Sequence, residues 1–260
     1  MKRNIKFLII TVLLFKIVST TYAWGELGHK IVAEIAKNYV SKCIQDSVKK
    51  YLGHMSWEAA SNWMDDVRGS AKYGYTSSWH YLNLENGQKY DSTNANGNNV
   101  VNQLQIAINK LMNKSKLTSE EIAFNLKVLF HLMGDFHMPL HVGMGSDRGG
   151  NDIAVNFLGQ QTSLHHIWDS NIIQFKNISF KDIENLLSTL PSDSIQKITS
   201  GSLIEWLSKT RKLLSVVYSY SSVVSNDYIN KCYPIIENQL LLAGVRLGSI
   251  LDNVFKTDKK

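Results

Sequence analysis

Apolar residues recur every three or four positions through most of the chain, which is the spacing of a helix with one buried face. The first such stripe consists of Ile31, Ile35, Tyr39 and Cys43. It continues to residue 52, and Gly53 then supplies a stop signal. The pattern predicts one long amphipathic helix that begins near residue 31 and ends at residue 52.

The same spacing predicts further helices along the chain. They are expected at 56–66, 100–112, 164–175, 183–190, 202–220 and 229–255. Thr118 and Glu121 form a capping box ahead of the apolar run 122–136. Pro139 cannot continue a helix, so the helix that begins after Thr118 is expected to end just before it.

Segments rich in turn-forming residues separate these helices. Residues 91–99 are rich in Asn, Gly and Ser and predict a loop, and 146–151 predict a turn. A small hairpin is expected between 153–158 and the segment that follows Gly159 and Gln160. The chain has 260 residues, of which 44% are hydrophobic, and shows no repeat or linker. The predicted fold is therefore mainly α: a single compact helical domain with a small β-hairpin.

The N-terminal segment 1–23 is typical of a signal peptide. Three basic residues precede a short apolar run over 7–18, and 21–23 (Thr-Tyr-Ala) place small residues at the two positions that a signal peptidase reads. An uncleaved membrane anchor is the alternative, but the run is shorter than the roughly 20 residues that a span needs. We expect cleavage after Ala23, which leaves 24–260 as one domain, secreted or within the secretory and endolysosomal system, with no stable membrane association.

Removing this segment changes the charge of the protein. The whole chain carries 28 Lys and Arg against 22 Asp and Glu, a net charge of +6. Four of the basic residues and none of the acidic ones lie in 1–23, so the remainder has 24 against 22 and a net charge of +2. A nearly neutral protein gives no support for a broad basic surface that binds nucleic acid by counterion release. Any affinity for phosphate must be local.

Two short sequence features fit an oxidising compartment. Cys43 and Cys232 are the two cysteines of the chain, and a disulfide between them is one expectation, with two free buried thiols as the alternative. Asn113 and Asn177 each begin an Asn-X-Ser triplet. Both are candidate glycosylation sites at the surface.

Five of the eight histidines fall between His131 and His166, and this clustering points to metal chemistry. His131 and Asp135 are four residues apart on one predicted helix, as are His165 and Asp169 on another, so each pair can converge on one ion. Histidines satisfied in the core, with carboxylates acting as caps, are the alternative. Burying so many titratable groups without a metal is costly, however. Imidazole with carboxylate and no nearby thiolate favours zinc.

These motifs resemble those of the zinc-dependent single-strand nucleases and 3'-nucleotidases of fungi and plants. Mature enzymes of that family begin with a Trp that is followed five residues later by a His, and the segment WGELGH supplies Trp24 and His29 in that arrangement. The rest of the family pattern follows in order as NWMDDVR, SSWHYLN, HLMGDFHMPLH, GGN and LHHIWD. The match runs from Trp24 to about Ile173, and the C-terminal helices match only in character.

The resemblance implies a cleft that holds three zinc ions. The implied ligands of the first zinc are Asp65, His80, His131 and Asp135; those of the second are the backbone amine and carbonyl of Trp24 with His29 and a bridging Asp135; and those of the third are His141, His165 and Asp169. A terminal amine with a pKa near 8 can bind a metal at neutral pH, whereas an internal amide nitrogen cannot. The second zinc therefore requires cleavage after Ala23. His54, His137 and His166 match no ligand position.

The resemblance also implies roles for residues near the metals. Asp65 would orient the attacking water as well as bind a metal, and Arg68 would neutralise charge on the phosphoryl oxygens. Tyr81 matches an aromatic platform on which a base stacks, and Asn151 matches a contact to phosphate. Asn83 stands where the family usually has Asp, which puts base preference in doubt because an amide both donates and accepts. A solvated residue on the helix surface is the alternative for Arg68. Without the resemblance, Tyr81 could equally be a core residue.

The implied activity is hydrolysis of single-stranded DNA, RNA and 3'-nucleotides to 5'-phosphate or dephosphorylated products by metal-activated hydroxide, in a monomer. A zinc phospholipase C is one rival interpretation, but its third zinc normally has Glu where this chain has Asp169. A secreted zinc-binding protein without turnover is the other rival. Arg68 and open positions at the third metal argue against it.

Overall fold

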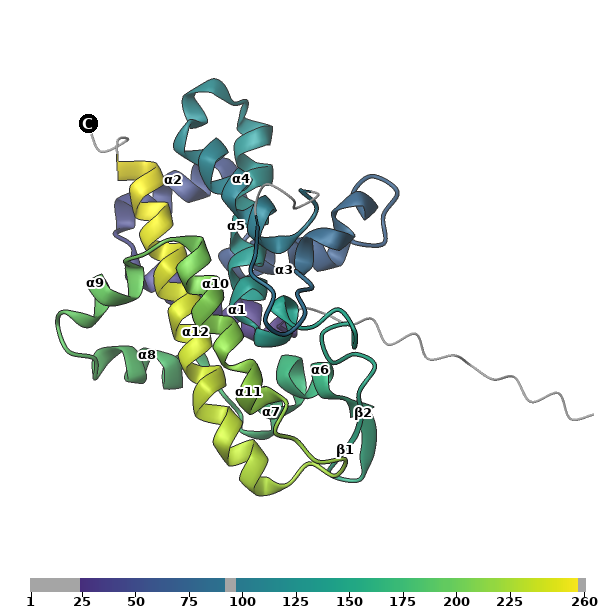
Figure 1. The fold of residues 1–260 in the computed structure, drawn as a ribbon. Helices are drawn as coiled ribbons and strands as arrows, with labels where there is room; N and C mark the ends of the chain where they lie inside the picture. Colours follow the sequence, from purple (N-terminus) through teal and green to yellow (C-terminus); the bar gives the residue numbers. More distant parts are fainter. Residues whose placement is uncertain (1–23, 92–96, 257–260) are drawn as a thin grey trace, which may run out of the picture.

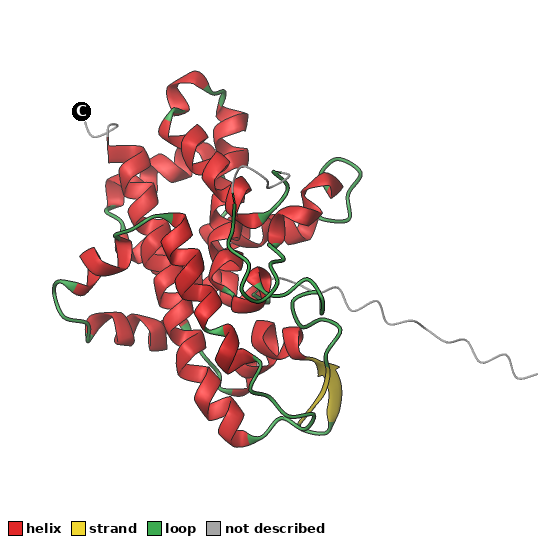
Figure 2. Ribbon diagram, viewed as in Figure 1, coloured by secondary structure: helices red, strands yellow, loops and turns green. Residues whose placement is uncertain are grey.

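The computed structural model describes residues 24–91 and 97–256. The predicted signal peptide and its cleavage point lie outside the described residues, as does the part of the predicted loop over 92–96. Helices dominate the described part of the chain, and its sheet consists of two strands (Figure 2). The predicted fold class, mainly α with a small β-hairpin, is confirmed.

The helical elements follow one another along the whole described chain. The α-helices are α1 (Glu26–Tyr39), α2 (Lys42–Leu52), α3 (Trp57–Val67), α4 (Val100–Met112), α5 (Ser119–His137), α6 (Leu164–His166), α7 (Ile172–Phe175), α8 (Phe180–Ser188), α9 (Ser194–Thr199), α10 (Leu203–Lys212), α11 (Leu214–Val217) and α12 (Asn226–Phe255). Short 3₁₀ helices are η1 (Gly74–His80), η2 (Lys114–Lys116) and η3 (Pro139–Val142), and η4 (Ile167–Asn171) is a π-helical turn.

Helix α5 is the centre of the packing. It contacts α3, α4 and α12, while α1 lies against α3, α5 and α12 (Figure 1). From residue 128 to its end every side chain of α5 is buried, so its last three turns are surrounded by protein. Polar residues on these turns have no access to bulk water.

Two glycines of α12 allow α1 to approach closely. A Cβ at Gly244 would lie 2.5 Å from the side chain of Ile35, and one at Gly248 would lie 2.5 Å from Tyr39. Larger side chains at these positions would push the helices apart. The contact fixes the position of α1 and therefore of His29, which lies on it.

The predicted boundaries of α5 are confirmed. The Thr118 side chain accepts from the Glu121 amide, and the Glu121 carboxylate accepts from the Thr118 amide, which is a complete capping box. At the other end Met138 adopts an extended conformation ahead of Pro139. Because the helix ends there, the chain turns into η3 and points His141 in a new direction.

The prediction of one continuous helix over 31–52 is wrong. Val40 and Ser41 are extended, with ψ near 155° and 158°, so α1 and α2 are separate helices. The break shifts the buried stripe of α2 by one position, to Ile44, Val48 and Leu52. The apolar spacing continued through the break, and this is why the sequence pattern did not reveal it.

The expected disulfide between Cys43 and Cys232 is absent from the described structure. Cys43 is exposed because the buried face of α2 begins at Ile44, whereas Cys232 is fully buried near the start of α12. Figure 1 shows α2 beside the opposite, C-terminal end of α12. Both cysteines are free in the described structure, as the alternative expected, but only Cys232 of the two thiols is buried.

The other helix predictions hold with smaller changes. The segment 164–175 is interrupted by the π-helical turn η4, and 202–220 divides into α10 and α11. The sequence pattern missed α9 and η1, which are short and irregular in apolar spacing. Among the described residues, no helix combines the length and apolar character needed to cross a membrane.

The predicted hairpin is confirmed with its turn one residue earlier. Strand β1 (Ala154–Phe157) pairs antiparallel with β2 (Gln160–Ser163), and Phe157 lies opposite Gln160. Leu158 and Gly159 form the turn with φ values of 52° and 87°, as a type I′ turn requires. The candidate glycosylation residues Asn113 and Asn177 are both exposed, and their modification stays a prediction.

Candidate metal centre and substrate pocket

Four predicted ligands from three elements meet at the centre of the molecule: Asp65 from α3, His80 from η1, and His131 and Asp135 from α5. His131 Nε2 lies 2.9 Å from His80 Nδ1, and these nitrogens lie 3.2 and 3.1 Å from Asp135 Oδ2. Asp65 Oδ1 lies 3.7 Å from His80 Nδ1 and 3.9 Å from His131 Nε2. We call this the first cluster.

These separations lie on both sides of the spacing expected for ligand atoms around one zinc ion. Tetrahedral zinc with bonds of about 2.0–2.1 Å to nitrogen and oxygen spaces its ligand atoms about 3.3 Å apart. The 2.9 Å contact between the two histidines also fits a hydrogen bond, but the contacts of Asp65 at 3.7 and 3.9 Å are too long for one. The four donors fit a tetrahedral metal better than a hydrogen-bonded network.

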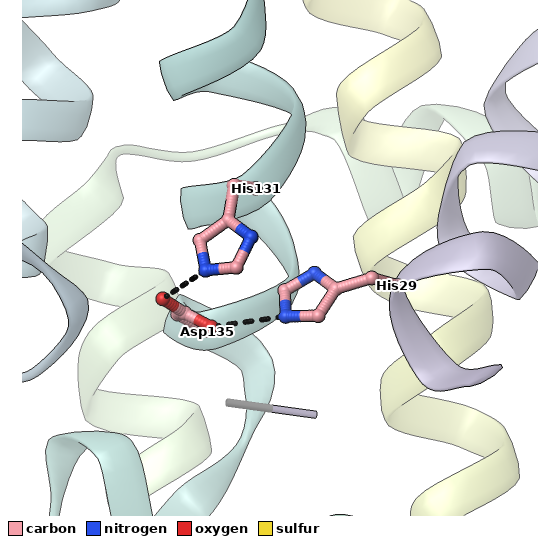
Figure 3. Close-up of side chains that lie close together, drawn as sticks. All are labelled: His29, His131 and Asp135. Carbon is pink, nitrogen blue, oxygen red and sulfur yellow. Dashed lines mark ion pairs between the residues drawn. The ribbon is translucent and has the colours of Figure 1, made fainter. Parts of the chain in front are cut away.

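Asp135 also faces a second group of donors, on α1. Its Oδ1 lies 3.3 Å from His29 Nε2, while Oδ2 points to His131 (Figure 3). The His29 and His131 rings stack with centroids 4.1 Å apart. The second cluster therefore shares the Asp135 carboxylate with the first, one oxygen to each.

Trp24 lies against the second cluster. A Cβ at Gly134 would lie 2.6 Å from His29 Nδ1 and 3.5 Å from Trp24 Cδ1, so the indole and the imidazole both cover this glycine. The Trp24 side chain is fully buried, and the next amide, that of Gly25, donates to the backbone carbonyl of Asp169 at 2.8 Å. Contacts on both sides therefore hold the start of the described chain between two groups of predicted ligands.

The third cluster consists of His141, His165 and Asp169. His165 Nε2 lies 3.3 Å from Asp169 Oδ2, and His141 Nε2 lies 3.8 Å from Asp169 Oδ1. Asp169 lies within the π-helical turn η4. Such turns are frequent at functional sites because they displace a side chain from regular helical spacing. These three residues meet the geometric requirement for a third metal.

Backbone carbonyls orient three of the histidines. His131 Nδ1 lies 2.6 Å from the carbonyl oxygen of Ser61, His141 Nδ1 lies 2.7 Å from that of His80, and His165 Nδ1 lies 2.7 Å from that of Gly149. When Nδ1 donates to the carbonyl, the lone pair is on Nε2, which faces the cluster in each case. Metal-binding histidines in proteins are oriented in this way.

Many buried polar atoms of the clusters have no hydrogen-bond partner among the described residues. They are both ring nitrogens of His29, both carboxylate oxygens of Asp135 and of Asp169, Asp65 Oδ1, His80 Nε2 and His141 Nε2. A buried polar atom without a partner costs free energy, and native structures contain few of them. Most of these atoms face one of the clusters, and each group of His and Asp residues could hold a metal ion that would satisfy them.

The protonation of the histidines suits metal binding near neutral pH. Burial lowers the pKa of His29 and of His141, and it lowers the pKa of His80 to about 4. Burial also lowers the pKa of His131, but the carboxylates, led by that of Asp135, outweigh it and raise this pKa to about 9. Three imidazoles are therefore neutral and able to bind a metal, while His131 must release a proton. Burial lowers the pKa of His165 as well, but the Asp169 carboxylate outweighs it and raises this pKa. Metal binding should weaken as the pH falls.

A cavity of about 260 Å³ opens beside the first and third clusters. It is lined by Arg68, His80, Tyr81, Asn83, Leu140, His141, Arg148, Asn151 and His165. All four residues with predicted contacts to substrate or phosphate thus lie with the predicted ligands. The Arg68 guanidinium lies 3.9 Å from Asp65 Oδ1, and the Tyr81 side chain is 40% exposed. Tyr81 is not the core residue of the alternative interpretation.

Two segments that carry site residues run side by side along this cavity. The amide of Leu82 donates to the carbonyl of His141, and that of Leu84 donates to Gly143. Arg211 of α10 donates to backbone carbonyls of both segments. Sequence reasoning missed this arginine because its acceptors are more than sixty residues away along the chain.

The three histidines without a predicted ligand position lie outside the clusters. His54 and His166 are exposed. His137 is buried between α5 and α12, where its Nε2 lies 2.7 Å from the Arg246 guanidinium and its Nδ1 lies 2.7 Å from the Met133 carbonyl. These contacts tie the end of the ligand-bearing helix to α12.

Comparison with known proteins agrees with this geometry. A family model described as S1/P1 Nuclease matches residues 24–256. The chain is 28% identical over 285 aligned positions to Endonuclease 2 of Arabidopsis thaliana, with 97% of each chain covered. It is 27% identical to Nuclease S1 of Aspergillus oryzae, with 89% of this chain and 92% of the relative covered, and 31% identical to Nuclease P1 of Penicillium citrinum over 68% of each. The chain belongs to the S1/P1 nuclease family, and the resemblance inferred from the motifs is confirmed.

The contact between Gly134 and His29 gives a test of the second cluster. We expect Gly134→Ala to displace His29 and to lower the zinc content of purified protein, measured by mass spectrometry of the metal after dialysis. The helix itself should persist, because Ala favours a helix by about 1 kcal/mol over Gly. Circular dichroism checks this. Gly69→Ala is the control, since a Cβ there meets nothing within 4 Å. Equal zinc content in G134A and in the wild type would contradict the assignment of His29 as a metal ligand of the second cluster.

Proposed function

We propose that this chain is a secreted zinc-dependent phosphodiesterase. It hydrolyses single-stranded DNA and RNA to products with 5'-phosphates and removes the phosphate of 3'-nucleotides. The observation that carries the proposal is the pair of clusters that share Asp135, beside a cavity lined by Arg68 and Tyr81. Membership of the S1/P1 nuclease family supports it.

The residues that would hold three zinc ions are those of the three clusters. The first zinc takes Asp65, His80, His131 and Asp135; the second takes His29, Asp135 and the amine and carbonyl of Trp24; and the third takes His141, His165 and Asp169. Bound zinc lowers the pKa of water to about 7 and stabilises charge on phosphate oxygens. Three dications against three aspartates would leave a local charge of about +3, which supplies the phosphate affinity that the overall charge does not.

The chain's own residues then position the reactants. Asp65 accepts a hydrogen bond from the attacking water and aims it at phosphorus, in line with the departing 3' oxygen. Arg68, whose guanidinium lies near Asp65, donates to the phosphoryl oxygens and neutralises the charge that develops on them. Asn151, which lines the same cavity, contacts phosphate.

The base side of the cavity explains a preference for single strands. The exposed face of Tyr81 offers a platform for stacking, and the Asn83 amide can both donate to and accept from the edge of a base. The clusters are almost fully buried, so a reacting phosphate has to enter the cavity. A base can follow it onto Tyr81 only when it is unpaired. The protein is expected to act as a monomer.

The proposed activity is tested with a panel of substrates. Protein that begins at Trp24 and is loaded with zinc should hydrolyse single-stranded DNA, RNA and 3'-AMP, and should leave phosphatidylcholine intact. Chelated protein is the control, and added zinc should restore its activity. Chromatography of the products should find 5'-phosphate ends. Absence of hydrolysis with every nucleotide substrate would refute the proposal, and cleavage of phosphatidylcholine alone would favour a phospholipase.

The role of the Trp24 amine has a separate test. We compare protein that begins at Trp24 with protein that has one extra residue before it. The extension converts the amine into an amide, which cannot bind zinc at neutral pH. We expect it to lose one zinc per chain and most of the activity, and trimming the extra residue with an aminopeptidase should restore both. The two forms having equal zinc and equal activity would show that the amine is not a ligand.

A further inference from the structure

Arg148 lines the substrate cavity, and none of the roles above is assigned to it. It belongs to the loop 145–151, next to Gly149, whose carbonyl oxygen lies 2.7 Å from His165 Nδ1. Arg68 also lines the cavity, but its guanidinium lies 3.9 Å from Asp65 of the first cluster. Arg148 therefore adjoins the third cluster, whereas Arg68 adjoins the first cluster.

The loop that carries Arg148 is held in place from several directions. The Ser146 amide and hydroxyl both donate to the Glu85 carboxylate, and the Gly150 amide donates to the Asp147 side chain. The Arg148 carbonyl accepts from the Asn151 side chain at 2.9 Å. These bonds join the loop to the segment that carries Asn83 and make Arg148 a fixed part of the cavity rim.

Arg148 adopts a backbone conformation that is unfavourable for its residue type. Its φ is 53°, in the left-handed region that glycine or asparagine would occupy at lower cost. Residues in such conformations persist where the surrounding structure enforces them, and they are enriched at functional sites. The loop therefore holds a long cationic side chain in this conformation at the lining of the cavity, where it can contact a ligand.

The guanidinium of Arg148 is available to a phosphate. Its side chain is 73% exposed, and it pairs at 3.2 Å with the Asp152 carboxylate, which is 51% exposed. An exposed pair of this kind is weak and can exchange for another anion. The planar guanidinium can donate two parallel hydrogen bonds to a phosphodiester.

We propose that Arg148 binds the phosphate of a nucleotide next to the scissile one. The proposal rests on the proposed function, in which the metals and Arg68 hold the reacting phosphate. Arg148 would hold a neighbouring phosphate as the strand leaves the cavity over the loop 145–151. A 3'-mononucleotide has no second phosphate, so this contact distinguishes a polynucleotide from a mononucleotide.

The test compares kcat/KM for 3'-AMP with kcat/KM for a single-stranded oligonucleotide of twelve nucleotides. We expect Arg148→Ala to lower the value for the oligonucleotide about 10-fold more than the value for 3'-AMP, which is the order expected for loss of one charge-assisted contact. The slope of log(kcat/KM) against log salt should become shallower by about 0.7 for the oligonucleotide. Arg148→Lys keeps the charge and the same backbone strain, so it should retain the wild-type slope.

Two controls separate binding from structural damage. Lys197→Ala also removes one cation from an exposed ion pair, but this pair lies on α9 and outside the cavity lining. The variant should leave kcat/KM unchanged for both substrates. The zinc content of R148A reports whether His165 is still held. Equal losses for both substrates, or an unchanged salt slope, would overturn the role of Arg148. A wild-type protein that hydrolyses neither substrate would instead overturn the proposed function itself.

Discussion

The structure depends on one buried carboxylate, that of Asp135. It is fully buried near the end of α5, and neither of its oxygens has a hydrogen-bond partner among the described residues. Such a group is costly to bury without cationic partners. The neighbouring histidines outweigh the effect of burial and hold its pKa well below the usual range. Its two oxygens face histidines from different helices, so the carboxylate sets the distance between the first and second clusters.

Much of the fold serves to bring partners to this carboxylate. The capping box at Thr118 and the break at Pro139 set the length of α5, so that His131 and Asp135 lie on its last turns while His141 turns away. The close contact of α12 with α1 places His29, and Gly134 leaves room for its ring. Arg211 and the His137–Arg246 contact join the surrounding segments to the C-terminal helices. The C-terminal part of the chain carries no predicted ligand, but its contacts hold the segments that carry the ligands in position.

The sequence predicted elements well where local chemistry decides the outcome. The bounds of α4 and the capping box of α5 follow from apolar spacing and end signals, and the hairpin follows from its turn residues. The break at Val40 was not predictable, because the apolar stripe continues across it and only packing shows the shift. The expected disulfide was wrong because α2 packs beside the C-terminal end of α12, whereas Cys232 lies near the start of that helix (Figure 1).

The candidate site divides in a similar way. His131 and Asp135 could be predicted as ligands because their spacing places them on one helical face. Arg148 directly precedes the GGN motif but was not itself predicted. Arg211 was invisible because it acts on backbone carbonyls that only the folded chain brings near. The overall charge did not predict the affinity for phosphate. Most of the net positive charge of the full chain lies in 1–23. The positive charge expected at the clusters comes instead from metal ions, which a count of charged residues does not include.

The most direct measurement is anomalous X-ray scattering at the zinc absorption edge, from crystals of protein that begins at Trp24 and is loaded with zinc. We expect three peaks per chain, two of them on either side of the Asp135 carboxylate with bonds of about 2.0–2.2 Å to its oxygens, and the third among His141, His165 and Asp169. Fewer than three peaks, or a pair of peaks that does not share Asp135, would contradict the central role of this carboxylate.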